Sequence, residues 1–232
     1  MHTPCFILAR KGSKGLKFKN RHIFFGKPLI EHTINHAIKS KYITKIIVST
    51  DDFEIAKIAK KKNCDVLYPR SKKYSDDKSN SHLAIKEVAT YFISKYGKFD
   101  IFGFLQVTEP LRPNNILDKC LKKLKSNKNL NSCFAGYILK NNFWFKNKKN
   151  YTLLVPNSET KIPRQNRKNI IREDCGVALA SRSKVIFNSD KLLKKPFEVI
   201  TYNGIRGLLD IHSKEDIKLG EALIDKFKLK IF

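Results

Sequence analysis

The sequence predicts an α/β fold with a mainly parallel sheet, on three observations. Short apolar or β-branched runs, at residues 6–9 and 45–49, are typical of buried strands. Between them, residues 28–40 have the apolar periodicity of an amphipathic helix and begin with a proline suited to the first helical position. Strand and helix then alternate, as in βαβ units, whose right-handed crossovers bring the strand ends to one edge of the sheet. We expect functional loops at that edge.

The same signals justify the remaining elements. Asp51 or Asp52 is suited to cap the next helix, which ends near Asn63. Ser213 and Asp216 have the spacing of a capping box at the start of the last helix. In chain order the pattern predicts a strand at 65–68, a helix at 82–95, a strand at 101–105, a helix at 115–125, strands at 132–139, 176–180 and 197–202, and the helix at 213–226.

The chain has 232 residues, of which 41% are hydrophobic, and is long enough to bury a substantial core. We interpret residues 1–232 as a single domain with an inserted arm at 137–170, because the stretch 147–168 is polar and carries few helix signals. The aromatic side chains of residues 143–145 are equally compatible with core packing and with a contact to a second subunit.

Several classes of protein are disfavoured. No run approaches the roughly 20 apolar residues of a membrane-spanning helix, and the first ten residues lack the basic region and the cleavage site of a secretory signal. The five cysteines are scattered, with neither a C-x-x-C pair nor zinc-ligand spacing. We therefore expect a cytoplasmic protein without a membrane partner, whose thiols are reduced.

The formal net charge is +26, from 47 basic and 21 acidic residues. Such a balance can indicate nucleic-acid binding. Here the lysines are spread along expected helix faces and are not gathered in a tail or an arginine-rich helix, so a biased composition accounts for many of them. A basic nucleic-acid-binding protein remains the alternative from a different class.

The loop at residues 10–20 is the most distinctive stretch, because five cationic side chains and two glycines follow directly on the first strand. Glycines let backbone N–H groups crowd around an oxyanion, and several cations together match a triphosphate. The spacing is neither G-x-x-x-x-G-K-[ST] nor G-x-G-x-x-G. This excludes the standard P-loop and dinucleotide fingerprints.

Polar residues follow other expected strands as well. The segment 69–81 is too long for a mere connector, and residues 106–113 follow the strand at 101–105. Asp210 stands near the end of an apolar run, where its carboxylate is expected to face the same edge of the sheet as the loop at 10–20. Asp210 is therefore a candidate for chemistry, whereas Asp216 is assigned to the helix cap.

Together these motifs resemble the acylneuraminate cytidylyltransferase family, the CMP-sialic acid synthetases. They occur in family order over nearly the whole chain. The matching stretches are residues 9–20 (A-R-x-G-S-K-G-x-x-x-K-N), 48–51 (V-S-T-D), Arg70 with 75–81 (S-D-D-x-S-x-S), 105–112 (L-Q-x-T-x-P-L-R), 163–165 (P-R-Q), Arg172 ahead of Gly176, and 210–217 (D-I-x-S-x-x-D-I).

The resemblance implies a Rossmann-like, three-layer nucleotidyltransferase fold with a mainly parallel sheet, in which the arm at 137–170 mediates homodimerisation and completes the neighbouring site. It implies a CTP-dependent enzyme that transfers CMP to the anomeric hydroxyl of a nine-carbon 2-keto sugar acid, sialic acid or a relative, and releases pyrophosphate. The implied cofactor is a divalent cation, usually Mg²⁺.

The resemblance also implies residue roles. The triphosphate would be held by Arg10, Ser13, Lys14 and Lys19, and the ribose and cytosine by Asn20, Arg70, Asp77, Ser79 and Ser81. The sugar acid would contact Gln106 and Thr108, with Arg164 and Arg172 near its carboxylate or the phosphates. Catalysis would rest on Arg10, Lys14, Lys19 and Asp210.

Two positions depart from the family pattern. Where the family usually offers two aspartates as D-x-D, this chain has Asp210 and His212. Asp210 alone can hold Mg²⁺ together with substrate phosphates; alternatively His212 holds a metal-bound water or tilts the preference toward Mn²⁺. Asp174 stands where the family has an amide, near the expected sugar pocket. Legionaminic, pseudaminic and Kdo-like acids therefore stay open as acceptors, and a catalytically degenerate member remains an alternative.

Overall fold

The computed structural model describes residues 2–13, 15–74, 81–154 and 162–231. In these ranges eight strands form one sheet, in the order β10-β7-β11-β6-β1-β4-β5, with β12 paired to β7. The first half of the sheet is parallel throughout, and it consists of β1 (Pro4–Leu8), β4 (Lys45–Ser49), β5 (Asp65–Leu67) and β6 (Ile101–Gln106).

The second half of the sheet is mixed. It consists of β7 (Ser132–Leu139), β10 (Ile170–Glu173), β11 (Leu179–Arg182) and β12 (Phe197–Tyr202). β11 runs antiparallel to β6 and β7, β10 runs antiparallel to β7, and β12 is parallel to β7. The strand predicted at 176–180 begins later, at Leu179, because the backbone turns first: Val177 N–H donates to the Asp174 carbonyl over 3.0 Å.

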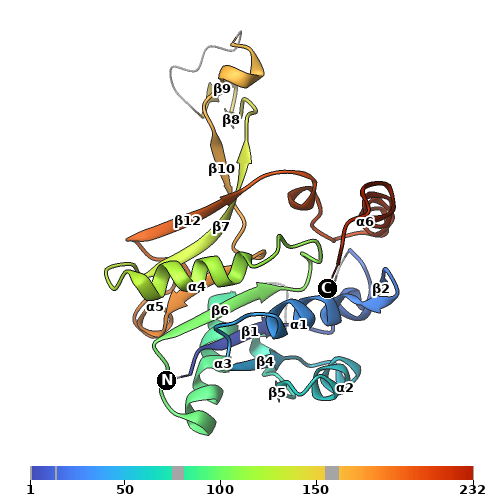
Figure 1. Ribbon diagram of the computed structural model, residues 1–232, viewed down its shortest axis with the longest axis vertical. Helices are drawn as coiled ribbons and strands as arrows, with labels where there is room; N and C mark the ends of the chain where they lie inside the picture. Colours follow the sequence, from blue (N-terminus) through green and yellow to red (C-terminus); the bar gives the residue numbers. More distant parts are fainter. Residues whose placement is uncertain (1, 14, 75–80, 155–161, 232) are drawn as a thin grey trace.

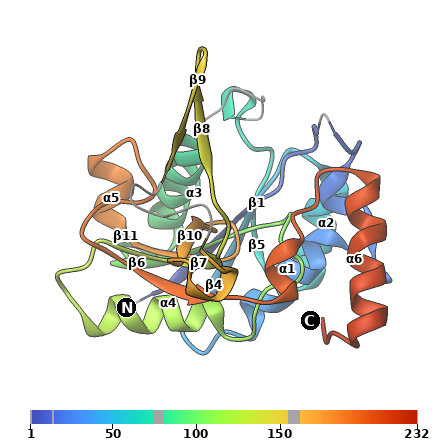
Figure 2. The same cartoon turned by 90° about the horizontal axis from the view of Figure 1, so that it is seen from above.

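Helices cover both faces of the sheet, so the expected three layers are confirmed. One face packs against α1 (Leu29–Ile38), α2 (Phe53–Lys61), α4 (Ile116–Ser126) and α6 (Lys214–Phe227), and the other against α3 (Ser81–Tyr96) and the short α5 (Ser183–Asn188). Figure 2 shows α3 and α4 on opposite sides of the sheet. In β1, Cys5 and Ile7 join one core cluster and Phe6 the other, as expected for a strand buried on both faces.

The helix starts agree with the capping signals, with one correction. Of the two candidate aspartates, Asp52 caps α2 and accepts a hydrogen bond from Glu54 N–H over 2.9 Å. Ser213 and Asp216 form the predicted capping box of α6. Pro28 is the N-cap of α1 and not its first helical residue, because its ψ of 140° is extended.

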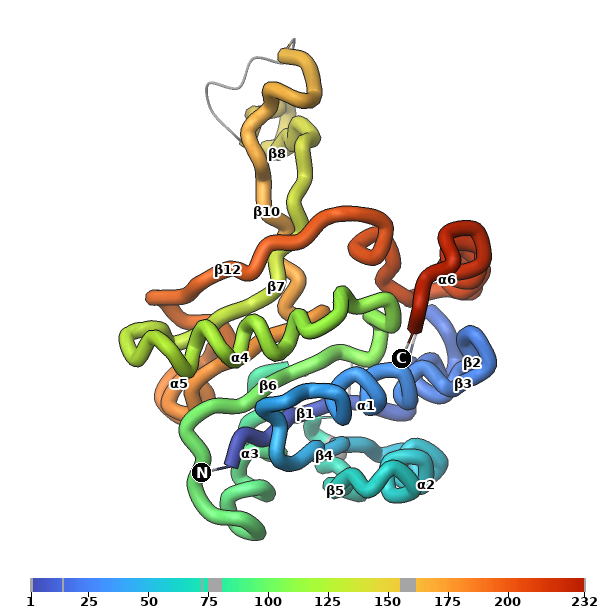
Figure 3. The backbone as a smooth tube through the Cα atoms, in the orientation of Figure 1, coloured from blue at the N-terminus to red at the C-terminus, as the bar shows by residue number. Residues whose placement is uncertain are grey.

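Two small hairpins stand outside the main sheet. One joins β2 (Ile23–Phe24) to β3 (Lys27–Pro28), and the other joins β8 (Trp144–Asn147) to β9 (Asn150–Leu153). The second hairpin projects from the body next to β10 and the end of β7 (Figures 1 and 3). The single-domain interpretation of 1–232 and the dimerisation role of 137–170 stay predictions.

Two further observations concern the cysteines and the possibility of a membrane-spanning helix. The five cysteines are free, and all lie in the described ranges. No helix among the described residues is both long enough and apolar enough to span a membrane.

Arg112 ties the two halves of the sheet together. Its fully buried guanidinium donates to the Val177 carbonyl over 2.9 Å, to the Gly176 carbonyl over 3.2 Å, and to the Gln106 carbonyl. It also donates to Thr33 Oγ1, in α1, over 3.2 Å. Burial lowers the pKa of Arg112 to about 10, so the side chain is cationic at neutral pH. Arg112 thus fixes the end of β6 against the segment before β11.

Replacing Arg112 by methionine is expected to lower the free energy of unfolding by about 3 kcal/mol or more, because buried carbonyl oxygens lose their donor. Urea denaturation measures this change. Lys119→Met is the matched control, since Lys119 is exposed on α4. A loss below about 1 kcal/mol for the Arg112 variant would contradict its linking role.

Candidate functional site

The loop after β1 is fixed at both of its ends. At its start, Thr50 Oγ1 donates to the Ala9 carbonyl over 2.5 Å, and Lys11 N–H donates to Asp51 Oδ1 over 2.6 Å. At its end, the buried Asn20 side chain donates through Nδ2 to the Arg10 carbonyl over 2.8 Å. The loop at 10–20 therefore closes on itself above the ends of β1 and β4.

A second segment, residues 210–212, lies directly against this loop. A Cβ added to Gly15 would come within 2.5 Å of the His212 carbonyl oxygen, so the two backbones touch. Ile211 N–H donates to the Thr108 carbonyl over 2.9 Å, which brings the segment to the end of β6. The carboxyl ends of β1 and β6 and the start of α6 thus meet at one place, as the sheet topology predicts.

A cavity of about 310 Å³ opens beside the loop. Eight of the residues predicted from the sequence line it: Arg10, Ser13, Lys19, Asn20, Arg70, Ser81, Gln106 and Thr108. We call it the basic cleft, because its lining includes three cationic side chains, Arg10, Lys19 and Arg70. Burial lowers the pKa of Lys19 and, for the same reason, that of Arg70.

Two buried polar atoms of the basic cleft lack a hydrogen-bond partner among the described residues, namely Arg70 Nε and Thr108 Oγ1. Arg70 is 7% exposed, and its Nη2 donates to the Tyr74 carbonyl. An unpartnered buried donor costs free energy, so such atoms are expected where a ligand supplies the missing partner.

A second cavity, of about 340 Å³, adjoins the basic cleft, and Gln106 lines both. Half of its eight lining residues are acidic, namely Glu109, Glu173, Asp174 and Asp210, and Arg172 lines it as well. We call it the acidic cavity. Gln106 therefore separates a cavity lined by several basic side chains from one lined by several acidic side chains.

Arg172 lines the acidic cavity, as expected, but its guanidinium is already paired. Nε and Nη2 donate to the two carboxylate oxygens of Asp174 over 2.7 and 2.9 Å, and Nη2 also donates to the Gly207 carbonyl over 2.7 Å. The Tyr202 hydroxyl donates to the same Asp174 carboxylate over 2.5 Å. Asp174, which stands where the family has an amide, therefore neutralises much of the charge that Arg172 would offer to a substrate.

Glu109 was missed by the sequence analysis, although it lies inside the motif at 105–112. It lines the acidic cavity, and burial, reinforced by the neighbouring Asp210 carboxylate, raises its pKa to about 8. The available signal was its place three residues after the end of β6, among residues already selected for that reason.

Asp210 and His212 lie beside Lys19. His212 Nε2 is 2.9 Å from Asp210 Oδ2, and His212 Nδ1 is 3.4 Å from Lys19 Nζ. No group of three or more His, Cys, Asp or Glu side chains suited to a metal ion occurs among the described residues. Asp210 nevertheless fits a magnesium ion that takes its other ligands from phosphates and water, since half of its side chain is exposed beside the basic cleft.

The other predicted residues are not brought to these cavities. Arg164 lies exposed in a 3₁₀ turn, η3 (Arg164–Asn166), and lines neither of them. Lys14, Asp77 and Ser79 fall outside the described residues.

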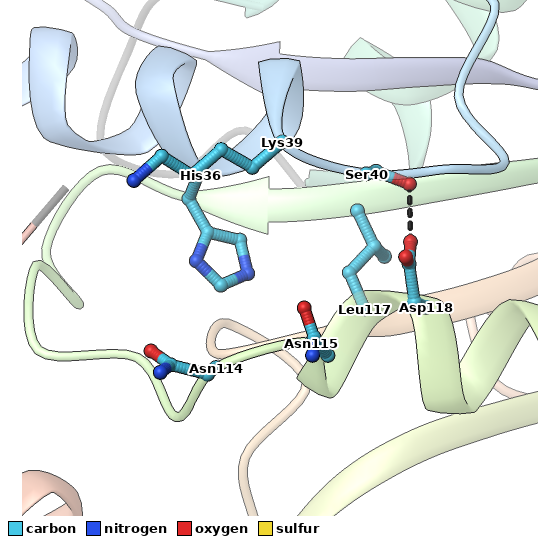
Figure 4. Close-up of a pocket in the computed structure, with 7 residues that line it drawn as sticks. All are labelled: His36, Lys39, Ser40, Asn114, Asn115, Leu117 and Asp118. Carbon is cyan, nitrogen blue, oxygen red and sulfur yellow. Dashed lines mark hydrogen bonds between the residues drawn. The ribbon is translucent and has the colours of Figure 1, made fainter.

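A third cavity, of about 140 Å³, lies between the end of α1 and the start of α4 (Figure 4). Figure 4 shows Ser40 donating to Asp118 across its rim, and Asp118 also accepts from Lys41 N–H over 3.0 Å. Burial lowers the pKa of His36 in its wall to about 3, so the imidazole is neutral. None of the residues predicted for function lines this cavity.

The family resemblance implies that the loop at 10–20 holds the triphosphate of CTP. On that expectation, Gly15→Ala should weaken CTP binding at least about 10-fold, because the added methyl group forces the loop away from the His212 carbonyl. Calorimetric titration with CTP measures the dissociation constant. Gly12→Ala is the matched comparison, since a Cβ there meets no atom within 4 Å. Equal affinities of the two variants would show that the contact does not position the loop.

Glu109→Gln is expected to stabilise the fold increasingly as the pH rises. The pKa of Glu109 is raised from 4.5 to about 8, so the native state binds the proton more tightly, and the wild type loses stability through this window. Glutamine does not titrate, so the difference in unfolding free energy should grow by roughly 2–4 kcal/mol between about pH 5 and pH 9. Urea unfolding tests this; a difference independent of pH would refute the assigned burial effect.

Comparison with known proteins identifies the family. The sequence model of the cytidylyltransferases matches residues 5–201. A pseudaminic acid cytidylyltransferase from Campylobacter jejuni is 35% identical over 127 residues, which make up 55% of this chain and 55% of that protein. An N-acylneuraminate cytidylyltransferase from Streptococcus agalactiae is 41% identical over 114 residues, 48% of this chain and 26% of the relative. The match thus spans about half the length of the first relative and about a quarter of the second.

A longer match is found with a CMP-N,N'-diacetyllegionaminic acid synthase from Legionella pneumophila, 27% identical over 225 residues and 97% of both chains. Among solved structures, a CMP:2-keto-3-deoxy-manno-octonic acid synthetase complexed with CTP has a TM-score of 0.72, with 14% identity, over 98% of this chain and 100% of that one. This likeness confirms the expected three-layer nucleotidyltransferase fold. Since the family model covers most of the sequence, this chain belongs to the cytidylyltransferase family.

Proposed function

We propose that this protein transfers CMP from CTP to the anomeric hydroxyl of a nine-carbon 2-keto sugar acid and releases pyrophosphate. One observation carries the proposal: a basic cleft with unpartnered buried donors adjoins an acidic cavity, and Gln106 belongs to both. Two substrates bound side by side, a polyanion and a polyhydroxylated acid, would meet at that residue.

The basic cleft is the proposed CTP site. Arg10, Ser13 and Lys19, with Lys14, are assigned to the triphosphate, because cations and loop amides neutralise phosphate oxygens. Asn20, Arg70 and Ser81, with Asp77 and Ser79, are assigned to ribose and cytosine. Arg70 Nε, a buried donor without a partner among the described residues, would donate to a carbonyl of the base.

The acidic cavity is the proposed acceptor site. Gln106, which lines both cavities, and Thr108, which lines the adjoining basic cleft, are assigned to the sugar, and Arg172 to its neighbourhood. The pairing of Arg172 with Asp174 argues that Arg172 orients this wall and offers little net charge to the sugar carboxylate. Arg164 would act only from the arm of a second copy, because it lines neither cavity of its own chain.

The proposed reaction is an in-line displacement at the α-phosphorus. The anomeric oxygen forms the new bond to phosphorus, the bond to the β-phosphate oxygen breaks, and the hydroxyl proton is released to water. Such a transfer depends on positioning and on charge neutralisation. Arg10, Lys14 and Lys19 would stabilise the charge that develops on the departing pyrophosphate.

Mg²⁺, or alternatively Mn²⁺, is the proposed cofactor, with Asp210 as its protein ligand and His212 nearby. When bound, the cation would neutralise phosphate oxygens as a Lewis acid. A homodimer joined through the arm at 137–170 and a cytoplasmic location also belong to the proposal. The exposed Trp144, Phe145 and Tyr151 of the arm are the kind of side chains that such an interface buries.

The relatives support a nonulosonic acid as the acceptor, since those with the higher identities are named for pseudaminic and N-acylneuraminic acids and the full-length match for a legionaminic acid. The structural neighbour named for a 2-keto-3-deoxy-octonic acid keeps a Kdo-like acceptor as an alternative.

The test is a pyrophosphate-release assay with each of the four nucleoside triphosphates, Mg²⁺ or Mn²⁺, and a panel of nine- and eight-carbon ulosonic acids. Release with CTP and one or more nine-carbon acids is the expected result. Lys19→Met serves as the inactive control, with an expected loss of about 100-fold or more. No release under any combination, together with salt-sensitive binding of RNA or DNA, would overturn the proposal.

A further inference from the structure

We propose that His212 is a positioning residue: its ring holds the Lys19 ammonium on one side and the Asp210 carboxylate on the other, so that Lys19 faces bound CTP with its charge intact. This inference rests on the proposed function, because it assumes that CTP occupies the basic cleft. It assigns His212 a different task from metal binding.

The partners of the ring define its hydrogen bonding. An ammonium group has donors and no acceptor, so Lys19 Nζ donates to His212 Nδ1 over 3.4 Å. An ionised carboxylate only accepts, so His212 Nε2 carries a hydrogen and donates to Asp210 Oδ2 over 2.9 Å. Both ring nitrogens are thereby engaged in a chain that runs from cation to anion.

The backbone of His212 is held firmly although its side chain is 64% exposed. Its N–H donates to Asp216 Oδ2 in the α6 capping box over 2.8 Å. Its carbonyl oxygen lies against Gly15 of the loop, and the preceding Ile211 N–H is bonded to Thr108. The backbone that carries the ring is therefore fixed where the loop at 10–20, the end of β6 and the start of α6 meet.

An imidazole acceptor suits Lys19 better than a carboxylate would. A carboxylate in this place would pair with the ammonium and cancel its charge, whereas a neutral ring nitrogen fixes its direction and leaves the charge available to a phosphate. Burial and the nearby Arg10 already disfavour the ammonium and lower the pKa of Lys19, while Asp210 acts in the opposite sense. Fixing Lys19 before CTP binds would reduce the entropy lost on binding.

The test is a double-mutant cycle on CTP affinity, measured by calorimetry in EDTA so that no metal takes part. Lys19→Met and His212→Phe, which keeps ring volume without nitrogens, are each expected to weaken binding about 10-fold. The double variant should bind no worse than Lys19→Met, because His212 acts through Lys19. His212→Asn, whose amide oxygen can replace Nδ1 as acceptor, should recover part of the loss.

Lys214→Ala is the matched control, since it removes an exposed cation two residues away and should leave CTP affinity and turnover unchanged. Thermal unfolding of each variant excludes a general loss of stability. Additive losses of CTP affinity in the double variant, or wild-type CTP affinity of His212→Phe, would overturn the inference. The proposed function would still stand in that case if the wild type shows CTP-specific turnover. Failure of the wild type to bind CTP would overturn both.

Discussion

The Arg112 guanidinium, fully buried behind the site, donates to carbonyl oxygens of Gln106, Gly176 and Val177. These atoms belong to the end of the parallel half of the sheet and to the turn that leads into its mixed half. Gln106 is the residue shared by the basic cleft and the acidic cavity. The relative position of the two cavities therefore depends on one cation and on the carbonyl groups that it holds.

A second constraint determines which charged side chains lie together beside the basic cleft. The segment 210–212 packs on the loop at 10–20 through Gly15, and this packing places Asp210 and His212 next to Lys19. The basic residues behind the net charge of +26 are distributed along the whole sequence, whereas Arg10, Lys19 and Arg70 line one cleft. The proposed function is thus assigned to a few buried or half-buried groups, and the abundance of lysine is treated as a separate property of the composition.

Much of the fold was predictable because the signals are local. Hydrophobic runs and caps predicted β1, β4, β6, α1 and α2 within a few residues. The strand-end rule selected the loops that form the basic cleft, and the family resemblance selected the individual residues within them. The features that the sequence did not predict depend on contacts between residues that are distant along the chain. Burial, reinforced by the neighbouring Asp210 carboxylate, raises the pKa of Glu109, and the charge of Arg172 is neutralised because a bend sets Asp174 beside it. The antiparallel pairing of β11 depends on a turn that no local motif marked.

The most direct test of this account is a crystal structure of the protein with CTP. The account predicts the triphosphate against the loop at 10–20 within hydrogen-bonding distance of Lys19 Nζ, with the cytosine toward Arg70 and the α-phosphate facing Gln106. CTP bound elsewhere, in the cavity between α1 and α4 or on the arm, would contradict it.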